Sequence, residues 1–326
     1  MKHLKLHETA DKFPIIGLGT WQAPPAVVES VVEKALEIGY RHIDTAFNYN
    51  NEEVIGKVLR KWIESGKGTR KDLFITTKLP HVGNRASDVR KFLKIQLERL
   101  QLEYIDLYII HVPFAFECNP DTLEPVVKEN GEYALDLNTN HNTTWAVFEE
   151  CLREGLIRNV GVSNFNEDQI SNIMKTCVVK PQVLQVELHV LFQQKQLQEF
   201  CKKNHIVLTA YAPLGSPGAI SHFAKKYEYQ TEGLPNMMND PRITELAKKY
   251  HKTPAQILLR FLVQQDIAII PKTTNEERLK ENFDILDFEL EPSDMDMLKS
   301  LDMGVDGRIF DFLFWKGVDE HPEYPF

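Results

Sequence analysis

The chain has 326 residues, of which 43% are hydrophobic and 26% are charged, and its formal net charge at pH 7 is −9. These proportions are ordinary for a folded globular protein and exclude a disordered, collagen-like or coiled-coil architecture. This negative net charge argues against a protein that binds nucleic acid or anionic membranes through its overall charge. The length allows about two or three ordinary domains or one large α/β barrel.

The cysteines and the N-terminal residues indicate a cellular compartment. The 4 cysteines, at positions 118, 151, 177 and 201, have no metal-binding or C-x-x-C spacing, so we expect reduced thiols. Residues 1–13 contain no apolar core of a signal peptide, and no apolar run reaches the roughly 18 residues of a membrane span. We therefore expect a soluble, cytoplasmic protein with neither membrane nor nucleic acid as partner.

Short apolar runs alternate with segments whose apolar residues follow helical spacing. The expected helices cover residues 24–38, 52–63, 87–100, 145–153, 168–176, 194–203, 243–250 and 254–264. The expected strands cover residues 15–18, 40–46, 72–77, 105–110, 157–162, 183–187, 206–210 and 267–270. Several of these strands are almost continuously apolar, as in parallel sheets that are covered on both faces.

This alternation predicts an α/β fold with a parallel sheet, and eight units in about 300 residues favour a single-domain (β/α)₈ TIM barrel. A doubly wound sheet is less favoured because the segment Gly17-Leu-Gly19-Thr-Trp-Gln22 has only the first two glycines of a dinucleotide-binding fingerprint. We assign residues 1–326 to one barrel domain with an irregular tail from about residue 302. The long segments 112–142 and 215–240 show no convincing periodicity and follow strands, so we expect loops over the C-terminal face, where barrel active sites lie.

Polar side chains follow three successive apolar strands. Asp44, Lys78 and His111 lie at or just beyond the ends of these strands, and Tyr49 follows Asp44 by five residues. Asp44 would keep Lys78 charged and oriented, and the ammonium would lower the pKa of the Tyr49 phenol. His111 would donate a hydrogen bond to a carbonyl oxygen. This set can protonate a carbonyl, but it needs a separate hydride source, which implies a nicotinamide or flavin cofactor.

Six ordered motifs resemble the aldo-keto reductase superfamily over about residues 13–302. They are GYRHIDTAFNYNNEEVIG (39–56), TTKLP (76–80), IIH (109–111), GVSNFN (161–166), TAYAPLGS (209–216) and IPKTTNEERLKEN (270–282). The resemblance implies an NADPH-dependent reductase with Tyr49 as general acid, tuned by Asp44 and Lys78, and with His111 orienting the substrate carbonyl.

The resemblance also implies a cofactor site that uses NADPH/NADP⁺. Ser163, Asn164 and Gln185 would hold the nicotinamide carboxamide, and Tyr211 would stack on its ring. The remaining implied contacts are Thr20, then Leu214 and Ser216 at the pyrophosphate, Lys272, Thr273 and Arg278 at the 2′-phosphate, and Glu281 and Asn282 at the adenine. The residues themselves support the phosphate contacts, because a lysine and an arginine placed close together suit a phosphate group.

Departures from the family pattern lie at the substrate pocket and in the loop that closes over the cofactor. Val112 and Pro80 stand where tryptophan is frequent in the superfamily, and Gly218 replaces an acidic residue of the loop that closes over the cofactor. Expected pocket residues are apolar: Trp21, Phe47, Phe114, Phe116 and Phe310. The ending GVDEHPEYPF and the long second loop are similar to insect members, some of which reduce 3-dehydroecdysteroids.

Three functions remain open at this point. The first is a monomeric NADPH-dependent reductase acting on a small-molecule carbonyl substrate such as an aldehyde or sugar. The second is a dedicated ecdysteroid 3-keto-reductase (3-dehydroecdysone reductase), and the third is an NADP(H)-binding sensor or scaffold without turnover. The intact set of Asp44, Tyr49, Lys78 and His111 argues against the third. A metal-dependent hydrolase is disfavoured because the chain lacks any His-x-His pair, and we expect no metal.

Overall fold

A closed parallel barrel forms the centre of the molecule. The computed structural model describes residues 2–228 and 236–326. Its main sheet has 8 parallel strands in the order β10-β9-β8-β7-β6-β5-β4-β3. These strands are β3 (Leu18–Gly19), β4 (His42–Asp44), β5 (Phe74–Leu79), β6 (Ile105–Ile110), β7 (Ile157–Ser163), β8 (Val183–Glu187), β9 (Val207–Tyr211) and β10 (Ala268–Ile269).

Backbone hydrogen bonds join the two ends of this sheet. The N–H of Gly17 donates to the carbonyl of Ile269 at 2.8 Å, and the N–H of Ile269 donates to the carbonyl of Ile15 at 2.9 Å. The N–H of Gly19 also donates to the carbonyl of Pro271 at 3.2 Å. The predicted (β/α)₈ TIM barrel is therefore confirmed.

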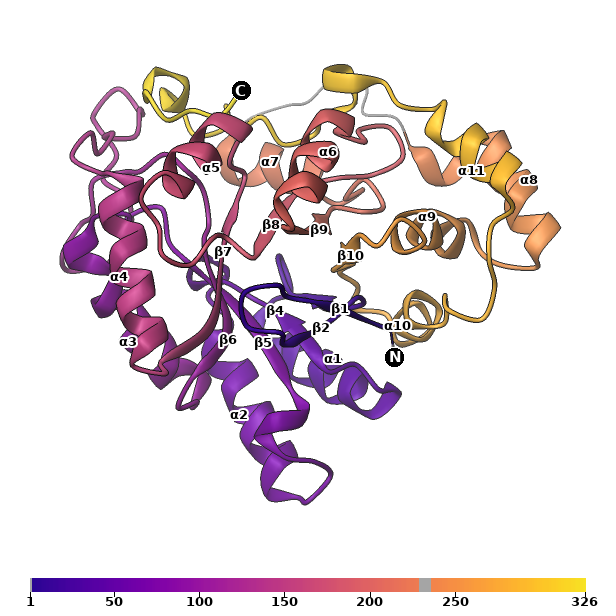
Figure 1. Cartoon of the computed structure of the whole chain (residues 1–326), viewed down its shortest axis with the longest axis horizontal. Helices are drawn as coiled ribbons and strands as arrows, with labels where there is room; N and C mark the ends of the chain where they lie inside the picture. The colour runs from indigo at the N-terminus through magenta and orange to yellow at the C-terminus, as the bar shows by residue number, and fades with distance from the viewer. Residues whose placement is uncertain (1, 229–235) are drawn as a thin grey trace.

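Helices cover the outside of the barrel (Figure 1). They are α1 (Pro25–Ile38), α2 (Glu52–Glu64), α3 (Ala86–Leu100), α4 (His141–Arg153), α5 (Glu167–Met174), α6 (Lys195–Asn204), α7 (Ala219–Tyr227), α8 (Pro241–Tyr250), α9 (Pro254–Val263), α10 (Glu276–Phe283) and α11 (Pro292–Lys299). Local sequence signals explain where several of these helices begin or end. Pro25 opens α1 and Gly39, at φ 122°, follows its last residue. The side chain of Asn140 caps α4, so this helix begins earlier than the apolar pattern predicts.

A β-hairpin that the sequence pattern does not predict covers the end of the barrel where the strands begin. Strands β1 (His3–Lys5) and β2 (Lys12–Pro14) pair antiparallel. The Phe13 ring packs against His42 and Phe74, with ring centroids 5.0 Å apart in both contacts. His42 and Phe74 begin β4 and β5, so the hairpin lies at the N-terminal ends of the strands, opposite the expected site.

The two long segments differ from each other. Residues 112–140 contain no helix, as expected, and isolated bridges hold the segment together, among them Phe116 to Leu135. The expectation of no regular element in residues 215–240 is wrong, because α7 and a 3₁₀ turn (Met237–Asn239) lie there; residues 229–235 fall outside the described part. Phe223 of α7 stacks on Phe314 of the tail at 4.5 Å. This tertiary contact stabilises a helix that the local pattern does not show.

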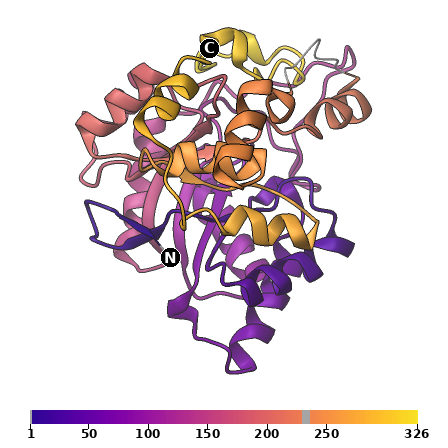
Figure 2. The same ribbon diagram turned by 90° about the vertical axis from the view of Figure 1, so that its right-hand side faces the viewer.

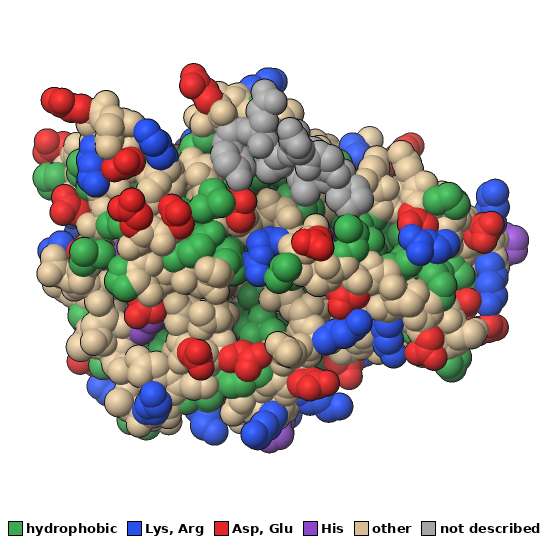
Figure 3. All heavy atoms as spheres, turned by 90° about the horizontal axis from the view of Figure 1, so that it is seen from above, with side chains coloured by type: hydrophobic (Ala, Val, Ile, Leu, Met, Phe, Trp, Pro, Cys, Tyr) green, Lys and Arg blue, Asp and Glu red, His purple; other side chains and the backbone are tan. Residues whose placement is uncertain are grey.

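The tail packs onto the C-terminal face of the barrel. It has only 3₁₀ turns (Gly304–Gly307 and Val318–Glu320), yet Ile309, Phe310 and Phe312 are buried. Figure 2 shows the tail in yellow at the same end of the molecule as the C-terminus. From above, hydrophobic side chains gather around a hollow in this face, with charged groups scattered around them (Figure 3). No helix within residues 2–228 and 236–326 is long and apolar enough to cross a membrane.

The seam between β3 and β10 leaves no space for a side chain at Gly19. A Cβ atom there would lie 2.5 Å from the carbonyl oxygen of Ile270, and a backbone atom in a barrel cannot move aside cheaply. We predict that Gly19→Ala lowers the free energy of unfolding by about 1–3 kcal/mol, measured by urea denaturation. Gly218→Ala is the matched control, because its Cβ would meet its nearest neighbour at 3.7 Å. Equal stability of the two variants would contradict this account of the seam.

Candidate active site

A buried ion pair lies at the C-terminal ends of β4 and β5. The ammonium of Lys78 donates to Asp44 Oδ1 at 2.5 Å and to the carbonyl of Thr45 at 2.8 Å. The two side chains are 0% and 2% exposed. The second carboxylate oxygen of Asp44 accepts a hydrogen bond from Gln185 Nε2 at 2.8 Å. Side chains from β4, β5 and β8 thus meet inside the barrel, as the sequence predicts for the first two.

Behind Lys78, a buried hydrogen-bond network that sequence reasoning missed supports β5. Gln96 of α3 donates to the carbonyl of Lys78 at 3.1 Å and to the carboxylate of Glu52 at 2.8 Å. The hydroxyl of Tyr108 donates to Gln96 Oε1 at 2.7 Å. The one available signal was the position of Gln96 on the apolar face of the predicted helix 87–100, where a glutamine needs buried partners.

Tyr49 and His111 lie beside this ion pair. The Lys78 ammonium is 4.9 Å from the centroid of the Tyr49 ring, and the rings of Tyr49 and His111 meet edge to face at 5.8 Å. Within the described residues, neither the Tyr49 hydroxyl nor the His111 ring forms a hydrogen bond. Both groups are thus available to one ligand atom. All four residues at the predicted strand ends come together.

Burial controls the protonation of these groups. It raises the pKa of Tyr49 well above its ordinary value, and the charge of Asp44 raises it further. Burial and the nearby Lys78 hold the pKa of His111 well below its ordinary value. The expectation of a lowered Tyr49 pKa is therefore wrong, because desolvation of the phenolate raises it. At neutral pH the site holds a protonated phenol and a neutral imidazole.

The residues expected at the nicotinamide end converge beside the ion pair. Tyr211 donates its hydroxyl proton to Asn164 Oδ1 at 2.8 Å, and Asn164 Nδ2 donates to Ser163 Oγ at 3.1 Å. Asn164 adopts the left-handed region at φ 63° and also donates to the carbonyl of His111. The hydroxyl of Thr20 donates to the carbonyl of Asp44 at 2.9 Å. Ends of β3, β7, β8 and β9 therefore surround the predicted catalytic groups.

The residues expected at the other end of the cofactor occupy the loops after β9 and β10. Leu214 and Ser216 precede α7, and Ser216 has φ 40°. Lys272 and Thr273 follow β10, whereas Arg278, Glu281 and Asn282 belong to α10. Burial and the like charge of Arg278 lower the pKa of Lys272. Within the described residues neither cation has an ion-pair partner, so the pair can take a phosphate.

Only some of the expected pocket aromatics come together. Phe310 of the tail packs edge to face on Trp21 at 5.5 Å and on Tyr211 at 5.4 Å. Phe114 and Phe116 are 0% exposed and pack under the tail, against Phe312 and Trp315.

Phe47 lies elsewhere. It packs on Phe92 of α3 at 5.0 Å and beneath the guanidinium of Arg99. The structure therefore places Phe47 in the core against α3 and does not bring it together with Trp21 and Phe310.

Comparisons with known proteins agree with this geometry. The family model described as "Aldo/keto reductase family" matches residues 15–303. The chain belongs to this family. Aldo-keto reductase family 1 member A1 of Xenopus tropicalis is 39% identical over 294 residues, which is 90% of this chain and 86% of that protein. Aldo-keto reductase family 1 member D1 of Oryctolagus cuniculus is 39% identical over 97% of this chain and 94% of its own length.

A solved structure shows the same aldo/keto reductase architecture. The aldose reductase from Schistosoma japonicum superimposes with a TM-score of 0.89 at 38% sequence identity, covering 100% of this chain and 99% of that one. Family membership supports an oxidoreductase that acts on carbonyl compounds.

One carboxylate at the end of β8 has a further role in this aldo/keto reductase. Glu187 contacts His189 Nε2 at 2.9 Å. Its two oxygens also accept the backbone N–H groups of Ile309 at 2.8 Å and Phe310 at 2.9 Å. Glu187 therefore ties the tail to the end of β8 and places Phe310 over the site. The sequence carried no signal for this contact, which spans more than a hundred residues.

The buried ion pair leads to a stability prediction. Asp44→Asn leaves the Lys78 ammonium buried without a countercharge, so the free energy of unfolding should fall by about 3–5 kcal/mol. Burial already lowers the pKa of Lys78, so a rise in pH deprotonates the unpaired ammonium of the variant and removes the cost of burying its charge. The loss of unfolding free energy should therefore be smaller at pH 9 than at pH 6.

Urea denaturation at both pH values measures this deficit. The double variant Asp44→Asn/Lys78→Met removes both charges and should regain at least half of the loss. A single variant as stable as the unmodified protein, or a deficit that grows with pH, would contradict the prediction.

Proposed function

We propose that this protein reduces aldehydes or ketones to alcohols with NADPH, and that Tyr49 donates the proton. The observation that carries the proposal is that the Tyr49 hydroxyl and the His111 ring, which form no hydrogen bond within the described residues, lie beside the buried Lys78–Asp44 ion pair. Two neighbouring hydrogen-bond donors can together hold a carbonyl oxygen. The residues named for this site all belong to one chain, and we propose that the protein acts as a monomer.

The protonation states suit this role. A buried phenol with a raised pKa keeps its proton at neutral pH and releases it only to a strong base. Negative charge that develops on a carbonyl oxygen supplies this base, and the neutral His111 ring orients the oxygen through its N–H. The Lys78 ammonium, 4.9 Å from the Tyr49 ring, then stabilises the charge left on the phenol oxygen.

The residues around this point fit a nicotinamide cofactor. Polar side chains of Ser163, Asn164 and Gln185 lie next to the catalytic groups. Lys272 and Arg278 offer positive charge that no ion pair neutralises in the part of the chain that the structure describes. When bound, the cofactor would supply the hydride. The preference for NADPH over NADH rests on the extra phosphate, which would neutralise the two cations.

The proposed substrate class follows from the aromatic side chains that pack beside Tyr211. Phe310, held by Glu187, and Trp21 offer aromatic surface, which suits an apolar carbonyl compound more than a sugar. A bulky ketone such as a 3-dehydroecdysteroid is the narrower proposal. A panel of short aldehydes, sugars and oxo-steroids, assayed by NADPH oxidation, separates these substrates. No turnover with any of them would favour an NADP(H)-binding sensor or scaffold.

Tyr49→Phe tests the proton donor, because it keeps the ring and removes only the hydroxyl. We predict a loss of kcat by about 10²–10⁴-fold, with NADPH affinity retained, as measured by steady-state assays and fluorescence titration. Tyr250→Phe is the matched control, since its hydroxyl bonds to Asp294 away from the site. A Tyr49→Phe variant with more than about a tenth of the original kcat would rule out this role.

Arg278→Met and Lys272→Met test the cofactor preference. Each removes one charge-assisted contact, so the Kd for NADPH should rise by about 10–100-fold while the Kd for NADH changes little. Lys248→Met, in the last turn of α8, is the control for a lost surface charge. Equal losses for both cofactors would show that Lys272 and Arg278 act on the fold instead.

A further inference from the structure

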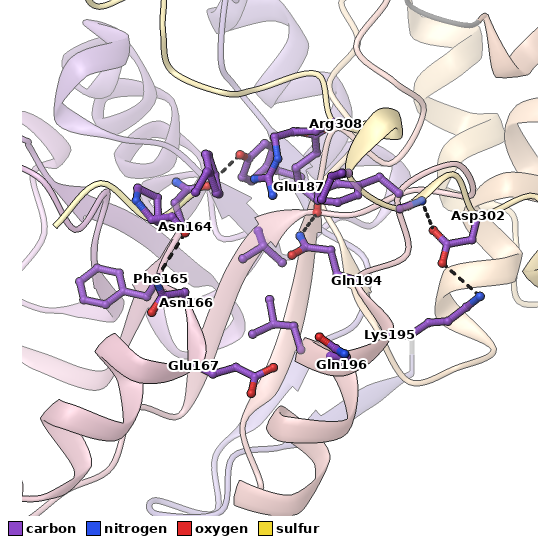
Figure 4. Close-up of a pocket in the computed structure, with 18 residues that line it drawn as sticks. Asn164, Phe165, Asn166, Glu167, Glu187, Gln194, Lys195, Gln196, Asp302 and Arg308 are labelled. Atoms are coloured by element: carbon purple, nitrogen blue, oxygen red, sulfur yellow. Dashed lines mark hydrogen bonds and ion pairs between the residues drawn. The ribbon is translucent and has the colours of Figure 1, made fainter. Parts of the chain in front are cut away.

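A cavity lies beside the catalytic groups, beneath the tail. Its volume is about 420 Å³, and it is bounded by the β7–α5 loop, the end of β8, the start of α6 and the tail (Figure 4). Cavities that hold small molecules begin at roughly this size. Asp44, Tyr49, Lys78 and His111 do not line it, and neither do Ser163 and Gln185. It is therefore separate from the proposed carbonyl site, although Asn164 and Tyr211 belong to the walls of both.

Arg308 of the tail supplies the positive charge of this cavity. Its guanidinium lies between two aromatic rings, 4.8 Å from the centroid of Phe192 and 3.5 Å from that of Phe326. Within residues 2–228 and 236–326 it forms no ion pair and no side-chain hydrogen bond. Burial lowers the pKa of Arg308, opposed chiefly by the charge of Glu187, so its charge is desolvated and incompletely compensated.

The acidic groups of the cavity already have partners or lie apart from Arg308. Both oxygens of Glu187 accept backbone N–H groups of the tail. Asp302 pairs with Lys195 at 3.1 Å. Glu167, at the start of α5, lies at the opposite end of the cavity from Arg308 in Figure 4. These carboxylates leave the guanidinium available but disfavour a ligand with several negative charges.

Apolar side chains make up much of the remaining wall. They are Phe165, Val186, Phe192, Leu197, Val305 and Phe326. A fixed guanidinium binds one carboxylate through two parallel hydrogen bonds, and the apolar wall removes a hydrocarbon or aryl body from water. Together these features define a ligand with one negative charge at one end and an apolar body at the other.

We propose that this cavity binds an apolar monocarboxylate, such as an aryl-substituted or medium-chain fatty acid, with its carboxylate against Arg308. The bound acid would touch Asn164 and Tyr211, whose side chains are joined by a hydrogen bond of 2.8 Å. Because both residues belong to the proposed nicotinamide end, the acid would change NADPH affinity from outside the carbonyl site. This coupling rests on the proposed function, whereas binding of the acid does not.

Calorimetric titration of the full chain with 4-phenylbutanoate tests the binding, with no cofactor or turnover required. The neutral 4-phenylbutanamide has nearly the same shape, so it should bind at least about ten-fold more weakly if Arg308 holds the carboxylate. Arg308→Met should weaken 4-phenylbutanoate by at least about ten-fold and leave the amide unaffected. Arg153→Met, at the exposed end of α4, is the charge control and should bind as the unmodified chain does.

Two further variants separate the cavity from the carbonyl site and from effects on the fold. His111→Leu should leave the Kd for 4-phenylbutanoate unchanged, because His111 does not line the cavity. Val305→Trp, at an exposed lining position, keeps the charge of Arg308 but fills space and should weaken both ligands. Equal binding of acid and amide, an unchanged Kd in Arg308→Met, or loss of binding in His111→Leu would overturn the proposal.

Discussion

The buried ion pair between Lys78 and Asp44 is the constraint on which the site depends. Removing both charges from water costs several kcal/mol each, so the pair persists only with close geometry and with its other hydrogen-bonding atoms satisfied. The carbonyl of Thr45 and the amide of Gln185 meet this requirement. Gln185 comes from β8, which lies four strands from β4 in the sheet order, so the barrel must be closed for the pair to be stable. Fold and chemistry are coupled through these contacts.

The tail packs on this rigid centre but contributes none of the hydrogen bonds that hold the ion pair. It has almost no regular structure, and it is held by buried aromatic residues and by the two backbone hydrogen bonds to Glu187. Phe310 reaches Trp21 and Tyr211 because of this attachment. Substitutions in the tail can therefore change the aromatic surface above the site without disturbing Lys78, whose partners all lie in the barrel.

Much of the fold was predictable because strands β6 and β8 are short apolar runs whose limits are set by local composition, and both were predicted with the bounds that the structure shows. The site was predictable where chemistry sits at strand ends, as at Asp44 and Lys78. Helix α7 and the roles of Gln96 and Glu187 were not, because they depend on contacts between segments distant in sequence. The pKa direction of Tyr49 was mispredicted for a related reason, since sequence shows a neighbouring charge but not the depth of burial.

Each of the two ligand sites proposed for this chain contains a cation that has no ion-pair partner within the described residues. By contrast, Arg90 and Arg85 are paired with carboxylates, as is usual in a folded protein. Lys272 and Arg308 are different, since burial lowers the pKa of both and neither forms an ion pair within the described part of the chain. Arg308 is partly buried, and keeping such a cation without a countercharge costs stability, which a bound anion would recover. Lys272 is exposed, so a bound anion would there chiefly relieve its repulsion with Arg278. The surrounding surface then decides which anion fits. The open loop after β10 suits a phosphate, and the aromatic walls around Arg308 suit a carboxylate with an apolar body.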